Sequence, residues 1–331
     1  MVLRTLAGLA GLLVLAAPAQ AVDLERPDVQ TFIQTMVRQH DYDPDKLRDI
    51  LGQAELDDSI VELISKPAEK TLTWAQYRAI FITRERIEAG AAFWKANRDA
   101  LDRVSTETGV PVRVVVGIIG VESYFGRITG GHRVLDALAT LAFDYPPRAK
   151  YFRSELVQFL LLVREEGMPA TAPIGSYAGA MGRPQFMPSS YRAYAVDESG
   201  DGKRDIWNDW GDVAGSIANY FVKHGWRADE EIVTRATLGE EFRGPAPEPA
   251  NTLEPADTIQ SLSDAGVMFS TDLPLDSEGQ LLVLQGAEGP EYWVGFHNFF
   301  VITRYNRSVM YALAVQQLGQ EIALEVARDG S

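Results

Sequence analysis

One carboxylate in an apolar stretch is well suited to acid–base chemistry. Glu122 lies in GIIGVESYFG, residues 117–126, where nearly all of its neighbours are apolar. Carboxylates are rarely buried without a partner, because burial of the unpaired charge is costly and favours the neutral acid. A carboxylic acid that stays protonated near neutral pH can protonate a glycosidic oxygen. Glu122 is therefore a candidate general acid. The alternative is a structural glutamate bonded to the backbone or to Arg127, and composition alone does not separate the two.

The segment around Glu122 has the pattern of a buried helix. Pro111 suits the first turn of a helix and Gly126 suits its end, and the residues between them are apolar on every side. Glu122 then falls in the last turn, where the partial negative charge of the helix terminus also favours the protonated acid. Ordinary glycoside hydrolysis needs a second carboxylate. Asp136 and Asp144 are near in sequence, but nothing places either across a substrate, and Asp136 equally suits a helix cap.

Helical patterns account for most of the remaining chain. Apolar spacing predicts helices over 29–37, 47–51, 73–81, 147–166, 189–195, 213–224 and 308–322, with a Thr73–Gln76 capping box and Asp212 as the cap of the 213–224 helix. Short strands are predicted over 231–238, 266–270, 280–285 and 291–303, with a Pro-rich loop at 243–257. The fold class is therefore mainly α (α+β), with a small β region inserted late in the chain.

The N-terminus and the composition indicate an exported protein. The chain begins MVLRTLAGLAGLLVLAAPAQA, in which a short apolar run follows Arg4 and Ala19-Gln20-Ala21 fits a cleavage site. Residues 1–21 are therefore predicted to be a cleaved signal peptide rather than a membrane anchor. The absence of cysteine excludes disulfides, thiolate metal sites and a lipid-modified cysteine. A formal net charge of −15 argues against nonspecific binding to nucleic acid or anionic lipid. We expect a periplasmic protein.

Three long stretches, in this order, resemble the lytic murein transglycosylase B family. They are GVPVRVVVGIIGVESYFGRITGGHRVLDALATLAFDYPPRAKYFRSEL, GSYAGAMGRPQFMPSSYRAYAVDESGDGKRDIW and FFVITRYNRSVMYALAV. The resemblance covers roughly residues 30–325 and implies a lysozyme-like helical core, a helical domain and a small β domain. It divides the chain into a signal peptide (1–21), an N-terminal helical domain (22–105), a catalytic core (106–226), a β domain (227–303) and a C-terminal segment that returns to the core (304–331).

The resemblance implies a reaction that needs only one carboxylate. In this family a glutamate, matched here by Glu122, protonates the oxygen of the MurNAc–GlcNAc β-1,4 bond of peptidoglycan. The same glutamate then acts as base on the C6 hydroxyl of that MurNAc, which closes a 1,6-anhydro ring. Because the attacking hydroxyl belongs to the substrate, proximity replaces the second carboxylate, and no cofactor is required. A lysozyme-type hydrolase that uses water and a non-catalytic peptidoglycan-binding scaffold are the alternatives. The retained carboxylate argues against the scaffold.

The resemblance also carries over residues of the glycan-binding groove. These are Ser176, Gln185, Tyr220, Tyr305, Asn306 and Tyr311. Tyrosines offer flat faces to sugar rings, and amides can bond to acetamido and hydroxyl groups. The sequence departs from the family at Arg183-Pro184, where an aromatic residue and a glycine are usual. The implied partners are peptidoglycan glycan strands and proteins of cell-wall synthesis.

A second motif, DESGDGKRDIWNDWGD at 197–212, resembles an EF-hand calcium loop. The first oxygen ligands fall at the expected spacing, and a glycine stands at the turn. The residue at the last position of the loop is Asn208 instead of the usual bidentate glutamate. Some members of the family bind calcium here and close the site with a later aspartate. The expected ligands of a structural calcium ion, outside the chemistry, are Asp197, Ser199, Asp201, Lys203 and Asp212.

Overall fold

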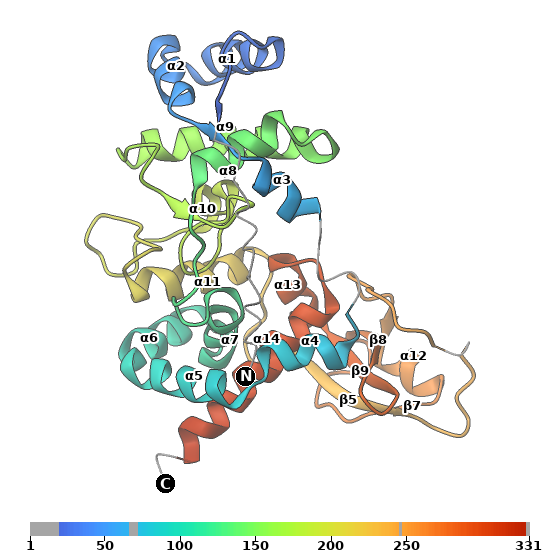
Figure 1. Ribbon diagram of the computed structural model, residues 1–331. Helices are drawn as coiled ribbons and strands as arrows, with labels where there is room; N and C mark the ends of the chain where they lie inside the picture. The colour runs from blue at the N-terminus through green and yellow to red at the C-terminus, as the bar shows by residue number, and fades with distance from the viewer. Residues whose placement is uncertain (1–19, 66–71, 245–246, 329–331) are drawn as a thin grey trace, which may run out of the picture.

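The computed structural model describes residues 20–65, 72–244 and 247–328, so residues 1–19 of the predicted signal peptide lie outside the described part. The described chain is mainly helical with a small sheet, which confirms the predicted fold class. At one end, three N-terminal helices pack near two core helices (Figure 1). These are α1 (Pro27–His40), α2 (Pro44–Gly52), α3 (Asp58–Ser65), α8 (Val134–Phe143) and α9 (Ala149–Glu165).

A second group of helices extends from the middle of the molecule to its lower end in Figure 1. The predicted N-terminal domain, residues 22–105, contributes helices to both groups. Its helices before residue 66 belong to the first group, whereas those after residue 72 pack mainly against helices of the second group. Among the described residues of the whole chain, no single helix is long and apolar enough to cross a membrane. The members of the second group are α4 (Trp74–Phe81), α5 (Arg84–Ala96), α6 (Arg98–Thr108), α7 (Val112–Ser123), α10 (Pro188–Tyr194), α11 (Trp210–Lys223), α13 (His297–Tyr305) and α14 (Val309–Arg328).

Helices α7 and α14 lie unusually close together, and the glycine Gly319 allows this. A Cβ atom added at Gly319 would stand 2.1 Å from the backbone oxygen of Arg113, well inside van der Waals contact. The backbone of α14 at Gly319 therefore packs directly against the backbone of α7 at Arg113. Because α7 carries Glu122 and α14 carries Tyr311, this crossing fixes how those two side chains face each other.

The late β region forms an antiparallel five-stranded sheet with its own small core. The strand order is β6-β8-β9-β5-β7, and α12 (Ile259–Asp264) packs on it. The core of this sheet is Ala236, Ile259, Leu262, Val267, Val294 and Phe296. The strands are β5 (Val233–Leu238), β6 (Asp257–Thr258), β7 (Val267–Met268), β8 (Glu278–Gln285) and β9 (Pro290–Phe296). In the Pro-rich loop predicted over 243–257, the described residues 243–244 and 247–256 contain no helix or strand, whereas Asp257 begins β6.

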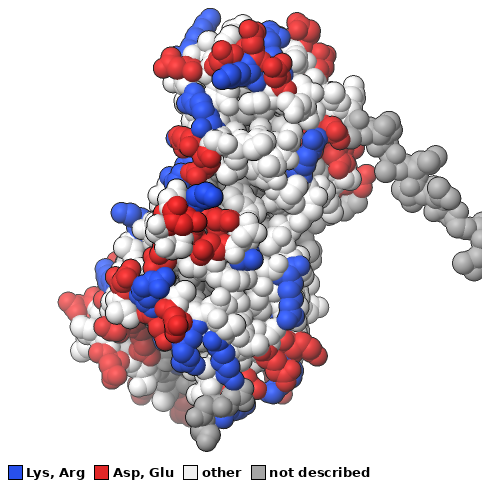
Figure 2. Space-filling model, turned by 90° about the vertical axis from the view of Figure 1, so that its left-hand side faces the viewer, with Lys and Arg blue, Asp and Glu red and all other residues white. Residues whose placement is uncertain are grey.

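Two short ladders and one 3-10 helix complete the described elements. The ladder of β1 (Gln20–Ala21) with β2 (Glu55–Leu56) lies beside α8. The ladder of β3 (His132–Arg133) with β4 (Ile174–Gly175) joins the segment after α7 to the glycine-rich loop. The 3-10 helix is Pro146–Arg148. On the face shown in Figure 2, acidic and basic residues are interspersed, so the net negative charge is not gathered into one acidic surface there.

Two local predictions were wrong. The strand predicted over 291–303 ends at Phe296, and residues 297–305 form α13. Its run of buried residues, Phe299 to Ile302, is apolar without a period, and such a run fits a buried helix as well as a strand. Asp212 does not cap α11. Asp209 does, because its carboxylate accepts from the backbone N–H groups of Gly211 and Asp212.

Candidate active site

Glu122 lies in the last turn of α7, as the sequence predicts, and its side chain is only partly buried. The hydroxyl of Tyr311, at the start of α14, donates to its Oε1 at 2.5 Å. Tyr311 itself is buried, and burial raises its pKa well above the usual range, with the Glu122 carboxylate raising it further. The tyrosine therefore remains a hydroxyl donor, which fixes the orientation of the carboxylate.

A strained turn follows Glu122 directly. Tyr124 and Phe125 have φ angles of 48° and 57°, and Gly126 follows at 79°. Two successive non-glycine residues in the left-handed region cost of order 1–3 kcal/mol each, and such conformations persist only where the surroundings impose them. The ring of Tyr124 lies between two guanidinium groups, 4.6 Å from Arg86 and 4.9 Å from Arg127. The backbone beside the carboxylate is thus held in place by packing.

The junction of α13 and α14 brings Tyr305 and Asn306 to the same region. The Tyr305 hydroxyl donates to the carbonyl of Pro184 at 2.7 Å. Burial raises the pKa of Tyr305 well above its usual range, and the negative charge of Glu122 raises it further. Asn306 is partly buried and terminates α13. Of the three predicted residues at this junction, Tyr311 contacts Glu122 directly, and Tyr305 and Asn306 end the helix that precedes α14.

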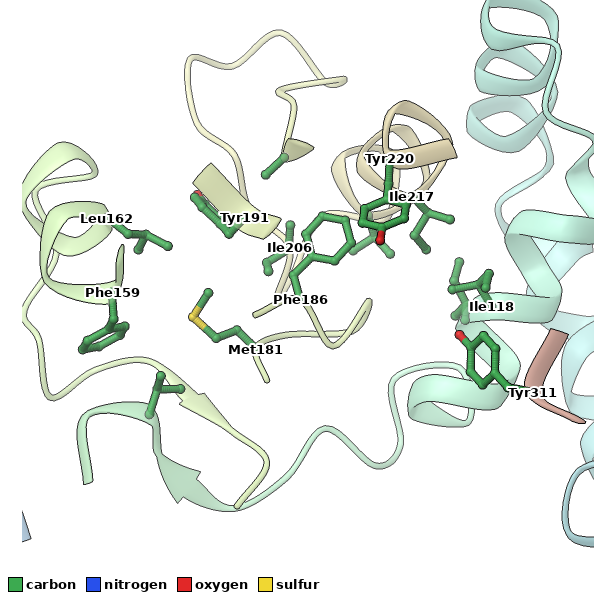
Figure 3. Packing of buried hydrophobic residues seen from close by; sticks show 14 of the residues in the cluster. Ile118, Phe159, Leu162, Met181, Phe186, Tyr191, Ile206, Ile217, Tyr220 and Tyr311 are labelled. Atoms are coloured by element: carbon green, nitrogen blue, oxygen red, sulfur yellow. The ribbon is translucent and has the colours of Figure 1, made fainter. Parts of the chain in front are cut away.

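Tyr220 of α11 supports this junction from behind. Its hydroxyl donates to the backbone carbonyl of Arg304 at 2.6 Å, and its ring lies 4.8 Å from that of Tyr305. Phe186 packs against both tyrosines, at 5.9 and 5.8 Å between ring centroids. Figure 3 shows Phe186 and Tyr220 side by side, with Tyr311 beside Ile118 of α7. Since Tyr220 is buried and its hydroxyl is bonded to the backbone, its main role here is to place Tyr305.

The glycine-rich loop 175–186 supplies the other side of the site. Gln185 has a left-handed φ of 53°, and its amide donates to the carbonyls of Thr129 and Gly182 at 3.1 and 2.8 Å. The loop is therefore tied to the segment that follows the strained turn. Ser176 lies on the same loop, where its Oγ accepts from the backbone N–H groups of Ala178 and Ala180. Backbone carbonyls that order the site leave no side-chain signal, so the sequence could not show them.

The two other carboxylates that the sequence offered are used elsewhere. Asp136 accepts from Arg133 Nε at 2.5 Å and from the backbone N–H of Glu55 at 2.9 Å, so it does not cap α8. Asp144 accepts from Arg26 at 2.6 Å. Asp144 is therefore held in an ion pair with Arg26 of the N-terminal segment. Asp136 is held in a local ion pair with Arg133, and its bond from Glu55 ties the N-terminal segment to α8. None of these contacts brings Asp136 or Asp144 to Glu122.

The 197–212 loop is internally bonded in a way that limits its fit to a cation. Asp197 accepts from the backbone N–H groups of Gly200 and Gly202, each at 2.7 Å. Burial opposes ionisation of Asp197, but these N–H groups together lower its pKa. Ser199 Oγ bonds to the same carboxylate, and Lys203 donates its backbone N–H to Asp201.

Asp212, the predicted closing ligand, is bonded to the backbone of the loop. It is fully buried, and its two oxygens accept from the backbone N–H groups of Glu198, Ser199 and Asp205 at 2.8, 3.0 and 2.8 Å. Burial raises its pKa despite these bonds. Among the described residues, no group of three or more His, Cys, Asp or Glu side chains is arranged to hold a metal.

The mainly helical core, in which the buried helix α7 carries Glu122 in its last turn, has the lysozyme-like fold of the lytic transglycosylases that it resembles in structure. The chain belongs to the transglycosylase SLT domain family, whose match spans residues 25–320. This confirms the family inferred from the sequence.

Individual relatives are similar over nearly the whole chain. Membrane-bound lytic murein transglycosylase B of Escherichia coli (strain K12) is 44% identical over 307 residues, which cover 90% of this chain and 83% of that protein. The structure of soluble lytic transglycosylase SltB1 from Pseudomonas aeruginosa has a TM-score of 0.85 at 46% identity, covering 92% of this chain and 100% of that one. The Escherichia coli lytic transglycosylase Slt35 in complex with calcium has a TM-score of 0.83 at 43% identity, covering 93% and 97%.

Proposed function

We propose that the protein is a lytic murein transglycosylase that cleaves the MurNAc–GlcNAc β-1,4 bond of peptidoglycan and forms 1,6-anhydroMurNAc. The observation that carries the proposal is the single glutamate at the end of the buried helix, bonded to Tyr311 and next to the strained turn. The family match and the names of the relatives support the same activity.

Glu122 is the proposed acid and base. As the neutral acid it gives its proton to the bridging oxygen, which leaves as the C4 hydroxyl of GlcNAc. The resulting carboxylate takes the proton of the C6 hydroxyl of the same MurNAc while that oxygen bonds to C1. The proton returns to Glu122, no water is consumed, and no cofactor takes part. Tyr311 holds the carboxyl group in one orientation through both steps, so that the reacting atoms stay close.

The proposed groove lies along the residues gathered around Glu122. Tyr305 would offer a ring face, and Asn306, Gln185 and Ser176 would offer polar groups to the acetamido and hydroxyl groups of the strand. Tyr220 acts behind them through its bond to the Arg304 carbonyl. The shared contact of Tyr305 and the glycine-rich loop at Pro184 supports one continuous surface.

The experiment that tests the function is mass spectrometry of the soluble products released from purified peptidoglycan. Wild type should release muropeptides that end in 1,6-anhydroMurNAc and are one water lighter than hydrolysis products, and Glu122→Gln should release none. Asp136→Asn and Asp144→Asn are the matched controls and should keep the activity. Ordinary reducing ends would indicate a hydrolase instead. Binding to the sacculus without release would indicate a scaffold.

Export and calcium binding form a second part of the proposal. We infer a periplasmic protein released from its signal peptide after Ala21, acting on glycan strands alongside proteins of cell-wall synthesis. Calcium, present in the Slt35 structure, would have a structural role only and would rest on Asp197, Ser199, Asp201 and the Lys203 carbonyl. Since Asp212 is committed to the backbone, affinity should be weak. Thermal unfolding with calcium and with a chelator tests this, and equal melting temperatures would contradict it.

A further inference from the structure

Arg183 marks the point where this sequence departs from the usual family pattern, and its surroundings give it a specific task. Its guanidinium carbon lies 3.7 Å from the ring centroid of Trp210, which is a close stacking contact. Its Nη1 donates to the carbonyl of Asn208 at 2.9 Å, and its backbone N–H donates to that of Ile206 at 3.0 Å. The side chain is therefore fixed at both its base and its tip.

The Arg183–Trp210 stack packs directly on the strained turn after Glu122. A Cβ atom added at Gly126 would stand 3.0 Å from Trp210 and 3.2 Å from Arg183 Nε, so both side chains lie against the backbone of Gly126. Trp210 also makes a T-shaped contact with Phe93, with ring centroids 4.6 Å apart, and Phe93 stacks on Phe125 at 5.5 Å. Two sides of the turn are thus occupied by one continuous set of planar groups.

We propose that Arg183 is a positioning residue that acts through Trp210 to hold the turn at 124–126, and with it the carboxylate of Glu122. Tyr124 and Phe125 occupy unfavourable left-handed conformations, so the turn relaxes when a neighbour is removed. Truncation of Arg183 uncovers Trp210 and opens space beside Gly126. Rotation of the last helical turn would then move Glu122 away from Tyr311.

Arg183 also joins this turn to the other side of the site. The next residue, Pro184, accepts from the Tyr305 hydroxyl, and Gln185 bonds to Thr129. Arg183, which is part of the glycine-rich loop, therefore ties this loop to the 205–210 segment and to the strained turn. The inference rests on the proposed role of Glu122 in catalysis, but the contact between Arg183 and the turn does not.

The test uses full-length Arg183→Ala, Arg183→Lys and Arg183→Tyr. Initial rates are measured over a range of concentrations of soluble, uncrosslinked peptidoglycan strands, with anhydro ends counted by mass spectrometry. Loss of positioning is expected to lower kcat about 10- to 100-fold in Arg183→Ala, with KM changed less than about threefold. Arg183→Lys, which keeps the charge but not the planar group, should behave like Arg183→Ala. Arg183→Tyr, which keeps a planar group, should recover most of kcat.

A matched control is Arg235→Ala, which removes another guanidinium stacked on a tryptophan, 4.6 Å from the ring of Trp293 in the β sheet. It should leave kcat unchanged. A kcat of Arg183→Ala within twofold of wild type would overturn the proposal. If Arg183→Ala does not fold, the same criterion applies to Arg183→Lys, and a kcat of Arg183→Lys within twofold of wild type would overturn the proposal.

Amide hydrogen exchange separates this inference from the proposed function. Ile128 donates its N–H to the Ser123 carbonyl at 2.9 Å and Phe125 donates to that of Ile119 at 3.3 Å, so both amides report on the turn. Exchange at these amides should be at least about tenfold faster in Arg183→Ala than in wild type. Unchanged exchange at these amides in Arg183→Ala would refute the inference, even if the wild-type protein has the proposed activity. Absence of anhydro products from wild type would refute only the proposed function.

Discussion

Gly319→Ala should impair both stability and catalysis, because it forces α14 away from α7. The added Cβ would stand 2.1 Å from the Arg113 carbonyl oxygen, whereas real Cβ atoms essentially never approach within 3.0 Å, so a gap of at least 0.9 Å must open. Overpacking of this kind costs about 1–3 kcal/mol, offset by about 1 kcal/mol of helix propensity. We expect a net loss of up to about 2 kcal/mol, which lowers the melting temperature by up to about 8 °C.

The same displacement reaches the active site. A shift of 0.9 Å would stretch the 2.5 Å bond between Tyr311 and Glu122 to the limit of hydrogen bonding. A misplacement of about 1 Å can lower kcat by about 100-fold. Calorimetry measures the loss of stability in Gly319→Ala, and the rate of release of anhydro muropeptides measures the loss of kcat. Gly52→Ala is the control, since its added Cβ meets no atom nearer than 3.9 Å and should be neutral or stabilising. Wild-type stability and kcat in Gly319→Ala would refute the reasoning.

Three further outcomes follow from other contacts. Asp212→Asn replaces an acceptor of three backbone N–H groups and should cost about 1–3 kcal/mol in urea unfolding, and an unchanged midpoint would contradict this. The hydrogen bonds from Arg192 lower the pKa of Glu165, so the pair stabilises the fold above the ordinary pKa of 4.5 and less as the pH falls. The stability difference between wild type and Arg192→Ala should therefore narrow below pH 4.5 in urea titrations, and a constant difference would argue against it. Tyr305→Phe removes the bond to Pro184 and should raise KM for soluble strands about two- to tenfold with little change in melting temperature.

Helix α7 and its glutamate could be predicted because local rules agree there. Pro111, the apolar run and Gly126 all indicate one buried helix, and the structure places Glu122 in its last turn. The capping box of Thr73 and Gln76 is also present. Such features depend on residues within a few positions of each other, which is the range over which sequence patterns carry information.

The partners of Glu122 could not be predicted from local pattern. Tyr311 lies 189 residues away, and only the family resemblance suggested that the two belong together. The left-handed conformations of Tyr124 and Phe125 are imposed by tertiary packing against their preference. Asp212 looked like a cap or a metal ligand because aspartate suits either role. Its burial under three backbone N–H groups depends on how the 197–212 loop folds back on α11.

The separation of Glu122 and Tyr311 along the chain also determines at what stage of synthesis the site can assemble. A polypeptide still being synthesised contains the glutamate long before the tyrosine, since 189 residues separate them. Both the Tyr311 bond and the Tyr305 contact to the glycine-rich loop require α13 and α14, which follow all the other described helices in the chain. Such long-range contacts form late, after the helices that surround them. A chain that stops before α13 therefore lacks an assembled site, so the site cannot form until these two helices have been synthesised.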